Sequence, residues 1–362
     1  MRLSRLILVV TFCASLATSA LQGRAADRDK KSPYNIETMK KGTSSRSALK
    51  EAKRVLPLNQ LMPAQRKRAE AILKSVSHFR QLPQLRFQVE PRVYQYFTLH
   101  PDAAVSIWRV MDISKFEMTE TSPRVFEADA GDGSKGVSDI LYQTPHECVL
   151  ICDGIYKNPL LVKPITAKGL VHLTTAYTLG PDREPVVVHR ASVFIAFPTT
   201  TLRTAARVIS PITNTIMDRN FHEISVFLQM MSMAMERQPA WVDKIVSGME
   251  GVDPERKPEL MGLTRRIRAK ATQRNLSVSM VDPISVEELT QPLTVLPLRG
   301  EAVAQQQSVN PQPDAPDDTG RVSLSSKKIP VRTASHRGSK LPVIIPRAVA
   351  ESVPNDETES DK

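Results

Sequence analysis

The spacing of apolar residues changes along the chain and divides its middle into a helical, a strand-forming and a second helical part. Over 64–80, apolar residues recur at intervals of three and four, which predicts an amphipathic helix. Over 85–90, apolar and polar residues alternate, which predicts a half-buried strand. Pro101 then begins a helix that extends to about residue 113, because proline suits the first helical turn.

After this helix, apolar and polar residues alternate with a period of two up to about residue 197. The pattern predicts six strands, at 115–121, 124–129, 136–143, 148–156, 169–177 and 186–197. The links between them are rich in Gly, Asp, Asn and Pro, which are turn residues. Six consecutive strands without an intervening helix favour an antiparallel meander over a parallel, nucleotide-binding sheet.

Helical spacing returns over 202–235. Pro211 should break or kink the first part of this region, and Asp218 is a candidate cap for a second helix. Shorter helices are expected at 240–247 and 254–271. The sequence therefore predicts an α+β domain over 63–250, followed by a C-terminal helix over 251–275.

Both ends of the chain differ from this middle. Residues 1–25 begin with Arg2 and Arg5 and continue with an apolar run and small residues, which is the pattern of a secretory signal peptide cut after Ala20 or Ala25. An uncleaved anchor is the alternative. We expect export to the periplasm or the exterior, with no membrane-spanning segment in the mature chain. Residues 276–362 are rich in proline and polar residues and should form a disordered tail.

The positive charge is concentrated near the N-terminus. The chain carries 49 Lys and Arg against 38 Asp and Glu, and residues 26–100 alone hold 16 against 6. We expect 26–62 to be a flexible basic arm, and an anionic envelope component is a candidate partner. A simply solvated arm is the favoured alternative. Aromatic residues do not alternate with the basic blocks, so nucleic acid is not an expected partner.

Candidate chemistry is sparse. His146, Glu147, Cys148 and Cys152 suggest a metal site, but residues four apart on a strand lie about 13 Å from each other, too far for one tetrahedral ion. The same distance excludes a Cys148–Cys152 disulfide, so two buried thiols are expected. Motifs for nucleotide binding or hydrolysis do not occur in the sequence, and we expect no cofactor and no metal.

Histidine and arginine on the predicted strands are the remaining candidates. His172 and His189 lie on strands and could meet in one cavity, with His222 and Glu223 on the helix as further titratable groups. Arg190 shares a strand face with Phe194, and a guanidinium among apolar neighbours needs an anionic partner. Asp139, Asp153, Asp218 or Glu223 would form a structural ion pair with it; a ligand carboxylate is the alternative.

Short motifs over about 85–245 resemble an uncharacterised family of secreted planctomycete proteins. They are His100-Pro101, Val105-x-Ile107-Trp108, Asp132-Gly133-x-x-Gly136, Asp153-Gly154-x-Tyr156, Arg190-x-x-x-Phe194 and Asp218-x-Asn220-Phe221. The order of helix, meander and long helix also resembles the helix-grip arrangement of the START-like, polyketide-cyclase-like superfamily. This second resemblance implies an antiparallel meander curved around a long C-terminal helix. Its members bind lipids, sterols or polyketides, so it implies a small apolar ligand.

The first functional hypothesis is therefore an exported, non-enzymatic binding protein with a small apolar or amphipathic ligand, such as a lipid, between sheet and helix. Its candidate ligand-binding residues are His172, His189, Arg190, Phe194, Ile224, Phe227 and Met231. The alternative is a cell-envelope interaction or scaffold protein that uses its basic arm and proline-rich tail. An enzyme with a His and Asp or Glu pair in the cavity ranks third.

Overall fold

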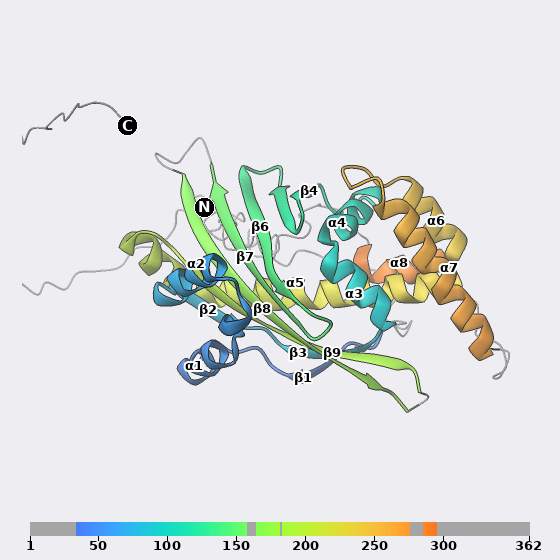
Figure 1. Cartoon of the computed structure of the whole chain (residues 1–362), viewed down its shortest axis with the longest axis horizontal. Coiled ribbons are helices and arrows are strands. Elements are labelled where there is room, and N and C mark those ends of the chain that lie inside the picture. Colours follow the sequence, from blue (N-terminus) through green and yellow to red (C-terminus); the bar gives the residue numbers. More distant parts are fainter. Residues whose placement is uncertain (1–33, 158–163, 182, 276–284, 295–362) are drawn as a thin grey trace, which may run out of the picture. The chain divides into compact units, whose positions relative to one another are not determined.

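The computed structural model describes residues 34–157, 164–181, 183–275 and 285–294. The signal segment predicted at 1–25 and most of the predicted tail lie outside the described residues. Over these described ranges the chain forms an α+β fold, with eight α-helices and a nine-stranded antiparallel sheet (Figure 1). The sheet is curled but not closed. None of the described helices is long and apolar enough to cross a membrane.

The N-terminal elements alternate between helix and short strand. In chain order they are β1 (Glu37–Lys40), α1 (Arg46–Val55), α2 (Pro63–Lys74), β2 (His78–Gln81), β3 (Gln84–Gln88), α3 (Pro91–Leu99) and α4 (Pro101–Val110). A short 3-10 turn, Leu58–Gln60, joins α1 to α2. The Ser45 side chain accepts a hydrogen bond from the Ala48 amide and so caps α1.

The meander and the C-terminal helices follow. The strands are β4 (Glu117–Ser122), β5 (Val125–Asp129), β6 (Ser134–Gln143), β7 (Glu147–Tyr156), β8 (Ile165–Leu179) and β9 (Pro185–Ala196). The helices are α5 (Thr200–Arg237), α6 (Pro239–Ser247), α7 (Arg256–Asn275) and α8 (Val286–Thr294). The strand order is β1-β3-β9-β8-β7-β6-β5-β4, and β2 also pairs with β9. The antiparallel meander predicted from the sequence is therefore confirmed.

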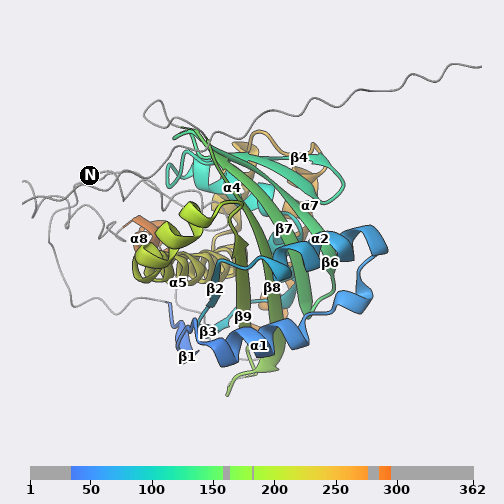
Figure 2. The same cartoon turned by 90° about the vertical axis from the view of Figure 1, so that its left-hand side faces the viewer.

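Strand pairing assigns every side chain to one of two faces, because successive residues point to opposite sides. We call inner the face that contains His189, Ala191, Val193 and Ile195 of β9, and outer the face that contains Arg190, Ser192, Phe194 and Ala196. Helices α3 and α5 lie on the inner face, and α1 and α2 lie on the outer face (Figure 2). The sheet is thus covered from both sides.

The inner face carries the larger core. Phe227 of α5 is buried, and its ring lies 5.2 Å from the ring of Phe97 and 5.3 Å from that of Trp108. Met230, Met231 and other apolar residues of α5 pack in the same cluster. The outer core is smaller: alanines and leucines of α1 and α2 cover Ile151, Leu170 and Phe194 of the sheet. Burial of these apolar stripes holds the helices on the sheet.

The structure differs from the sequence prediction near the N-terminus. Residues 34–62, for which we predicted a flexible arm, contain β1, which pairs with β3, and α1, which packs on the outer face. Ala48, Leu49 and Ala52 of α1 form the apolar stripe that makes this contact. Residues three and four apart share one helix face, and this stripe was masked by the surrounding lysines and arginines. The basic residues of α1 are thus displayed on a folded surface.

Two further predictions about helices need correction: Pro211 does not break the helical region, and a helix forms in the predicted tail. Pro211 lies inside α5, which continues from Thr200 to Arg237 without a second start at Asp218. Proline in a helix costs about 3 kcal/mol, and packing of the rest of α5 against the sheet offsets this cost. Helix α8 forms within the segment predicted as tail, and its Leu289 is fully buried.

Candidate functional site

The candidate residues chosen from the sequence do not meet in one place. Ile224, Phe227 and Met231 of α5 lie in the inner core, together with His189. His172, Arg190 and Phe194 belong to the outer face, because His172 pairs with Ser192 and the other two alternate with His189. Residues on opposite faces of a sheet are separated by the sheet itself. A single cavity cannot contain both groups.

His189 belongs to a closed hydrogen-bond network on the inner face. Its Nε2 lies 2.9 Å from the Ser225 hydroxyl of α5, and its Nδ1 lies 3.2 Å from the Tyr94 hydroxyl. The Tyr94 oxygen is also 2.9 Å from the hydroxyl of Thr175. All four residues are buried, and desolvation lowers the pKa of His189 to about 3. The imidazole therefore stays neutral and joins β9 to α3 and α5.

The α5 candidates are packed by protein side chains. Phe227 and Met231 are buried with no significant exposed surface, and Ile224 is half-buried against the same cluster. Methionine adapts its shape to irregular gaps, which suits this dense region between helix and sheet. These side chains hold α5 on the sheet, and their surfaces are occupied by one another.

The outer-face candidates are likewise engaged in structure. Phe194 is fully buried, and its ring lies 5.2 Å from that of Phe79 beneath α1 and α2. His172 Nε2 is 3.3 Å from a carboxylate oxygen of Glu147. Burial lowers the pKa of His172, and the hydrogen bond with Glu147 opposes this effect.

Arg190 has none of the acidic partners that we considered. Its Nε donates to the carbonyl oxygen of Leu82 over 3.3 Å, and desolvation lowers its pKa. Each candidate acid pairs with another cation: Asp139 with Arg68, Asp153 with Lys168, Asp218 with Arg80, and Glu223 with Arg219. The Arg190 guanidinium thus binds a main-chain carbonyl and not the carboxylate that we expected.

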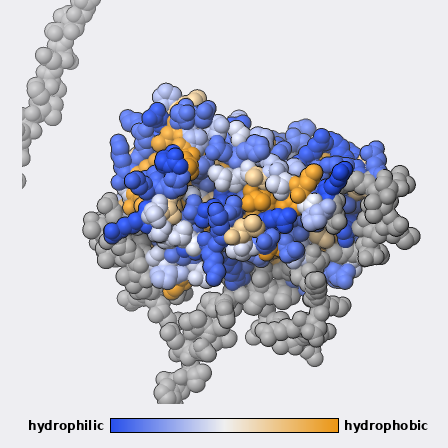
Figure 3. Space-filling model, turned by 90° about the horizontal axis from the view of Figure 1, so that it is seen from below, coloured by the Kyte–Doolittle hydropathy of each residue, from blue (hydrophilic) through white to orange (hydrophobic). Residues whose placement is uncertain are grey.

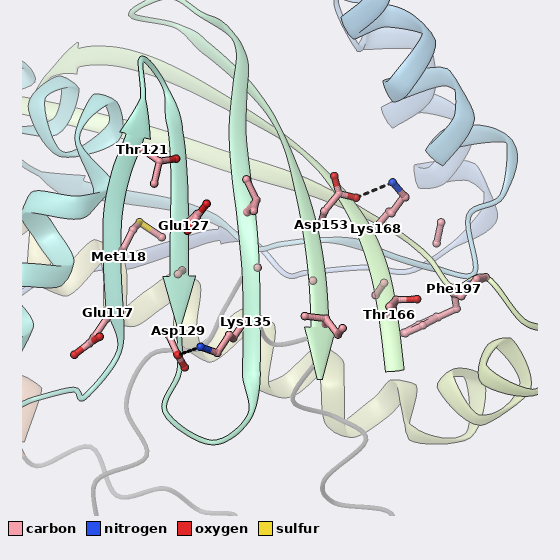
Figure 4. A pocket seen from close by; sticks show the side chains of 18 of the residues that line it. Glu117, Met118, Thr121, Glu127, Asp129, Lys135, Asp153, Thr166, Lys168 and Phe197 are labelled. Carbon is pink, nitrogen blue, oxygen red and sulfur yellow. Dashed lines mark ion pairs between the residues drawn. The ribbon is translucent and has the colours of Figure 1, made fainter. Parts of the chain in front are cut away.

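A large pocket lies on the outer face, where strands β4 to β8 extend beyond α2. Its volume is about 1010 Å³. Two rows of side chains cross the strands and line it. They are Glu117, Asp129, Lys135, Ile155 and Thr166 in one row, and Thr119, Glu127, Val137, Asp153, Lys168 and Ala196 in the other. Ser75, which follows α2, and Phe197, which follows β9, also line the pocket (Figure 4).

Small residues in the strands beneath the pocket account for its depth. The row between the two lining rows contains Ala128, Gly136, Gly154 and Ala167, and their main chain borders the pocket. Most of the lining surface is apolar. Val137 keeps 38% of its surface exposed, and Ile155 next to it is half-buried. The middle of the pocket is therefore a shallow apolar surface on which a flat or extended molecule fits.

Charged groups surround this apolar surface. Lys135 Nζ lies 2.7 Å from a carboxylate oxygen of Asp129, and the hydrogen bond lowers the pKa of Asp129. Lys168 Nζ lies 2.9 Å from Asp153 (Figure 4). Glu127 lines the same pocket and has no ion-pair partner among the described residues. Such groups hold the polar part of a ligand by ion pairs and hydrogen bonds.

Sequence reasoning missed this pocket because its lining resembles an ordinary solvent-facing strand surface. Asp153, Gly154 and Gly136 were noted only as parts of motifs in the family resemblance. A row of Gly and Ala at paired positions of four strands is the signal that could have pointed to it. Reading that signal requires the register, since the row exists only when the strands are aligned.

Metal-binding and thiol sites are the other kinds of site that the candidate residues suggest. No group of three or more His, Cys, Asp or Glu side chains in the described part of the chain has an arrangement that would hold a metal ion. Cys148 and Cys152 are buried thiols on the inner face, as predicted from the strand spacing. Burial raises the pKa of Cys148 to about 12. This thiol is therefore protonated at neutral pH.

Comparison with known proteins adds little. No family model matches the sequence, and no curated protein matches it. A solved structure, that of a conserved protein from Geobacillus kaustophilus, is similar to 46% of this chain over 95% of its own length. The identity is 8% and the TM-score is 0.29.

Proposed function

We propose that this chain is a binding protein that holds a small amphipathic molecule in the outer-face pocket. The observation that carries this proposal is the pocket of about 1010 Å³ with an apolar middle and a charged surround. Ligand pockets in proteins have volumes of about 300–1,000 Å³ and combine apolar lining with a few polar groups. The pocket matches both properties.

The pocket also specifies how such a ligand would lie. Its apolar part would cover Val137 and Ile155 and the main chain of Gly136 and Gly154. Its polar part would meet the Lys168–Asp153 pair or the Lys135–Asp129 pair, where each cation and anion is accessible. Contact with apolar surface would supply most of the affinity, and the ion pairs would fix the orientation.

This proposal places the ligand elsewhere than the sequence suggested. We expected it between the sheet and the face of α5 that contains Phe227 and Met231. Those side chains pack against the inner core, so a ligand could enter there only if the packed side chains moved apart. Opening a packed core costs several kcal/mol, whereas the outer-face pocket is already formed.

Native mass spectrometry of the full chain, before and after organic extraction, tests the proposal. We expect the loss of a discrete mass of roughly a few hundred daltons on extraction, the size that a pocket of this volume holds. The extracted chain should then show a rise in melting temperature with one of three probes: a fatty acid, a sterol or an isoprenoid. An unchanged mass together with no thermal shift by any probe would overturn the proposal.

A pair of variants locates the binding. Val137→Trp combined with Ile155→Trp fills the pocket, and we expect the affinity for the active probe to fall at least about tenfold because the bulky rings exclude it. Thr178→Trp is the matched control, since Thr178 is an exposed β8 residue outside the pocket lining. Equal affinity in the two variants would mean that the ligand binds elsewhere. Circular dichroism verifies that both remain folded.

A further inference from the structure

Helices α1 and α2 form a basic surface on the outer face. Together they contain eight Lys and Arg residues and two Glu residues, a net charge of +6. They lie side by side, since Lys53 of α1 donates to the Leu73 carbonyl of α2 over 2.6 Å (Figures 1 and 2). Their buried residues face the sheet, so the charged residues point outward.

Only three of these eight cations form an ion pair, and Lys53 donates to a main-chain carbonyl instead. Arg54 pairs with Glu51, Arg66 with Glu70 and Arg68 with Asp139. Arg46, Lys50, Lys67 and Lys74 are exposed and have no acidic partner among the described residues. Arg46 and Lys50 are four residues apart on α1, and Lys67 and Lys74 are seven apart on α2, so each pair lies on one side of its helix. Two stripes of uncompensated positive charge result.

Large apolar side chains are exposed at the junction of the two helices. Val55 is the last residue of α1 and keeps 45% of its surface exposed. Met62 directly precedes α2 and is 63% exposed. The view of the molecule from below shows apolar side chains between hydrophilic ones (Figure 3). Cations combined with protruding apolar groups are typical of surfaces that lie on a lipid bilayer.

We propose that the basic surface of α1 and α2, with Val55 and Met62, docks the protein onto a membrane that contains anionic lipids. The four unpaired cations meet the lipid phosphates, and the two apolar side chains insert at the level of the headgroups. Each Lys or Arg near an anionic bilayer contributes about a fivefold increase in binding. A nucleic acid partner would leave Val55 and Met62 without a role.

The position of α2 gives this docking a consequence for the pocket. Ser75 follows α2 and lines the pocket, and Arg68 of α2 lies 4.0 Å from Asp153 in the pocket lining. A smaller hollow of about 230 Å³ lies between α2 and the sheet and shares Asp153, Lys168 and Ala196 with the large pocket. A membrane on α1 and α2 is therefore next to the pocket, where an amphipathic molecule would pass between the two. This link rests on the proposed function, whereas docking itself does not.

Vesicle cosedimentation of the full chain tests the docking. One set of vesicles consists of phosphatidylcholine, and the other contains about one third phosphatidylglycerol. We expect binding to the anionic vesicles that falls at least about tenfold when salt is raised from 0.1 to 1 M, since the screening length falls from about 10 to about 3 Å. Equal binding to both kinds of vesicle would overturn the proposal.

Variants assign the effect to this surface. Replacing Arg46, Lys50, Lys67 and Lys74 with Gln should lower binding to anionic vesicles at least about tenfold. The matched control replaces Lys244, Arg265 and Arg266 of α6 and α7 and Arg92 of α3 with Gln, which removes the same charge from other exposed positions. We expect a change below about twofold there. Equal losses in the two variants would show that only net charge matters and would overturn the proposal.

Two further measurements separate the alternatives. Val55→Ser combined with Met62→Ser should lower vesicle binding by a similar factor at both salt concentrations, because apolar contact is not screened. A chain that binds duplex DNA through the four cations but no vesicle would overturn the proposal in favour of nucleic acid. Val137→Trp with Ile155→Trp should leave vesicle binding unchanged, so docking and ligand binding can fail independently.

Discussion

The two faces of the sheet are covered in different ways, and only one of them is fully packed where the strands β4 to β8 end. On the inner face, α3 and α5 contribute large apolar side chains that pack against the strands, and the buried His189 is hydrogen-bonded to Tyr94 and Ser225 within the protein. On the outer face, α1 and α2 cover only part of the strands, and the pocket lies on the part that they leave. The inner face thus carries the larger core, and the outer face carries a smaller core and the open pocket.

Truncating one side chain on each face gives the largest expected contrast. Phe227→Ala should lower the free energy of unfolding by about 3–5 kcal/mol, because it removes a buried ring that packs between Phe97 and Trp108. Val137→Ala in the pocket should cost less than about 1 kcal/mol, because Val137 is partly exposed. Urea unfolding measures both values. Similar losses would show that the outer strands depend on packing as much as the inner core does.

Acid should weaken the inner face through its histidines. Burial lowers the pKa of His189 to about 3 and that of His78 to about 4, below the value of about 6.5 in an unfolded chain. The unfolded state therefore binds more protons below pH 6.5. Stability is complete above that pH and falls as the pH drops toward 4, by about 1.4 kcal/mol per pH unit for each histidine.

His189→Gln isolates one of these contributions. We expect the slope of unfolding free energy against pH, between pH 6 and 4, to decrease by about 1.4 kcal/mol per unit. At pH 8 both chains carry no charge at this position, so the difference there reports only the altered contacts with Tyr94 and Ser225. An unchanged slope would mean that His189 is protonated in the folded chain.

Ion pairs give the smallest contrast between the faces. Arg80 of β2 donates from two nitrogens to Asp218 of α5, and both side chains are largely shielded from solvent. Arg80→Gln should cost about 1–3 kcal/mol, since it leaves a shielded carboxylate without its partner. Lys168→Gln on the outer face should cost less than about 1 kcal/mol, because the Lys168–Asp153 pair is exposed. Losses that rank in the opposite order in urea unfolding would contradict the assignment of structural roles to the inner face.

Much of the fold could be predicted because it depends on local periodicity. Alternation over 115–197 specified the meander, and spacing of three and four specified α5. Helix α1 was missed because its short apolar stripe lies among lysines and arginines. The continuity of α5 through Pro211 was missed because it depends on contacts with the sheet rather than on local preference.

The site could be predicted far less well. His189 and Phe227 were candidate ligand-binding residues, and the structure places both in the buried inner side of the sheet. Strand pairing decides which candidates share a face. His172 pairs with Ser192, which lies three residues from His189 on β9, so the two histidines point to opposite faces. The pocket depends on five aligned strands and on where α2 ends. These are relations between distant segments, and a single sequence does not display them.

The two buried cysteines allow the opening of the inner face to be measured by chemical modification. The Cys148 thiol is protonated at neutral pH and shielded from solvent, so an alkylating reagent modifies it only when the sheet around it opens. The rate of modification at high reagent concentration then equals the rate of that opening, and at low concentration it reports the equilibrium between closed and open states. The protein thus carries its own probe of how often its central strands separate.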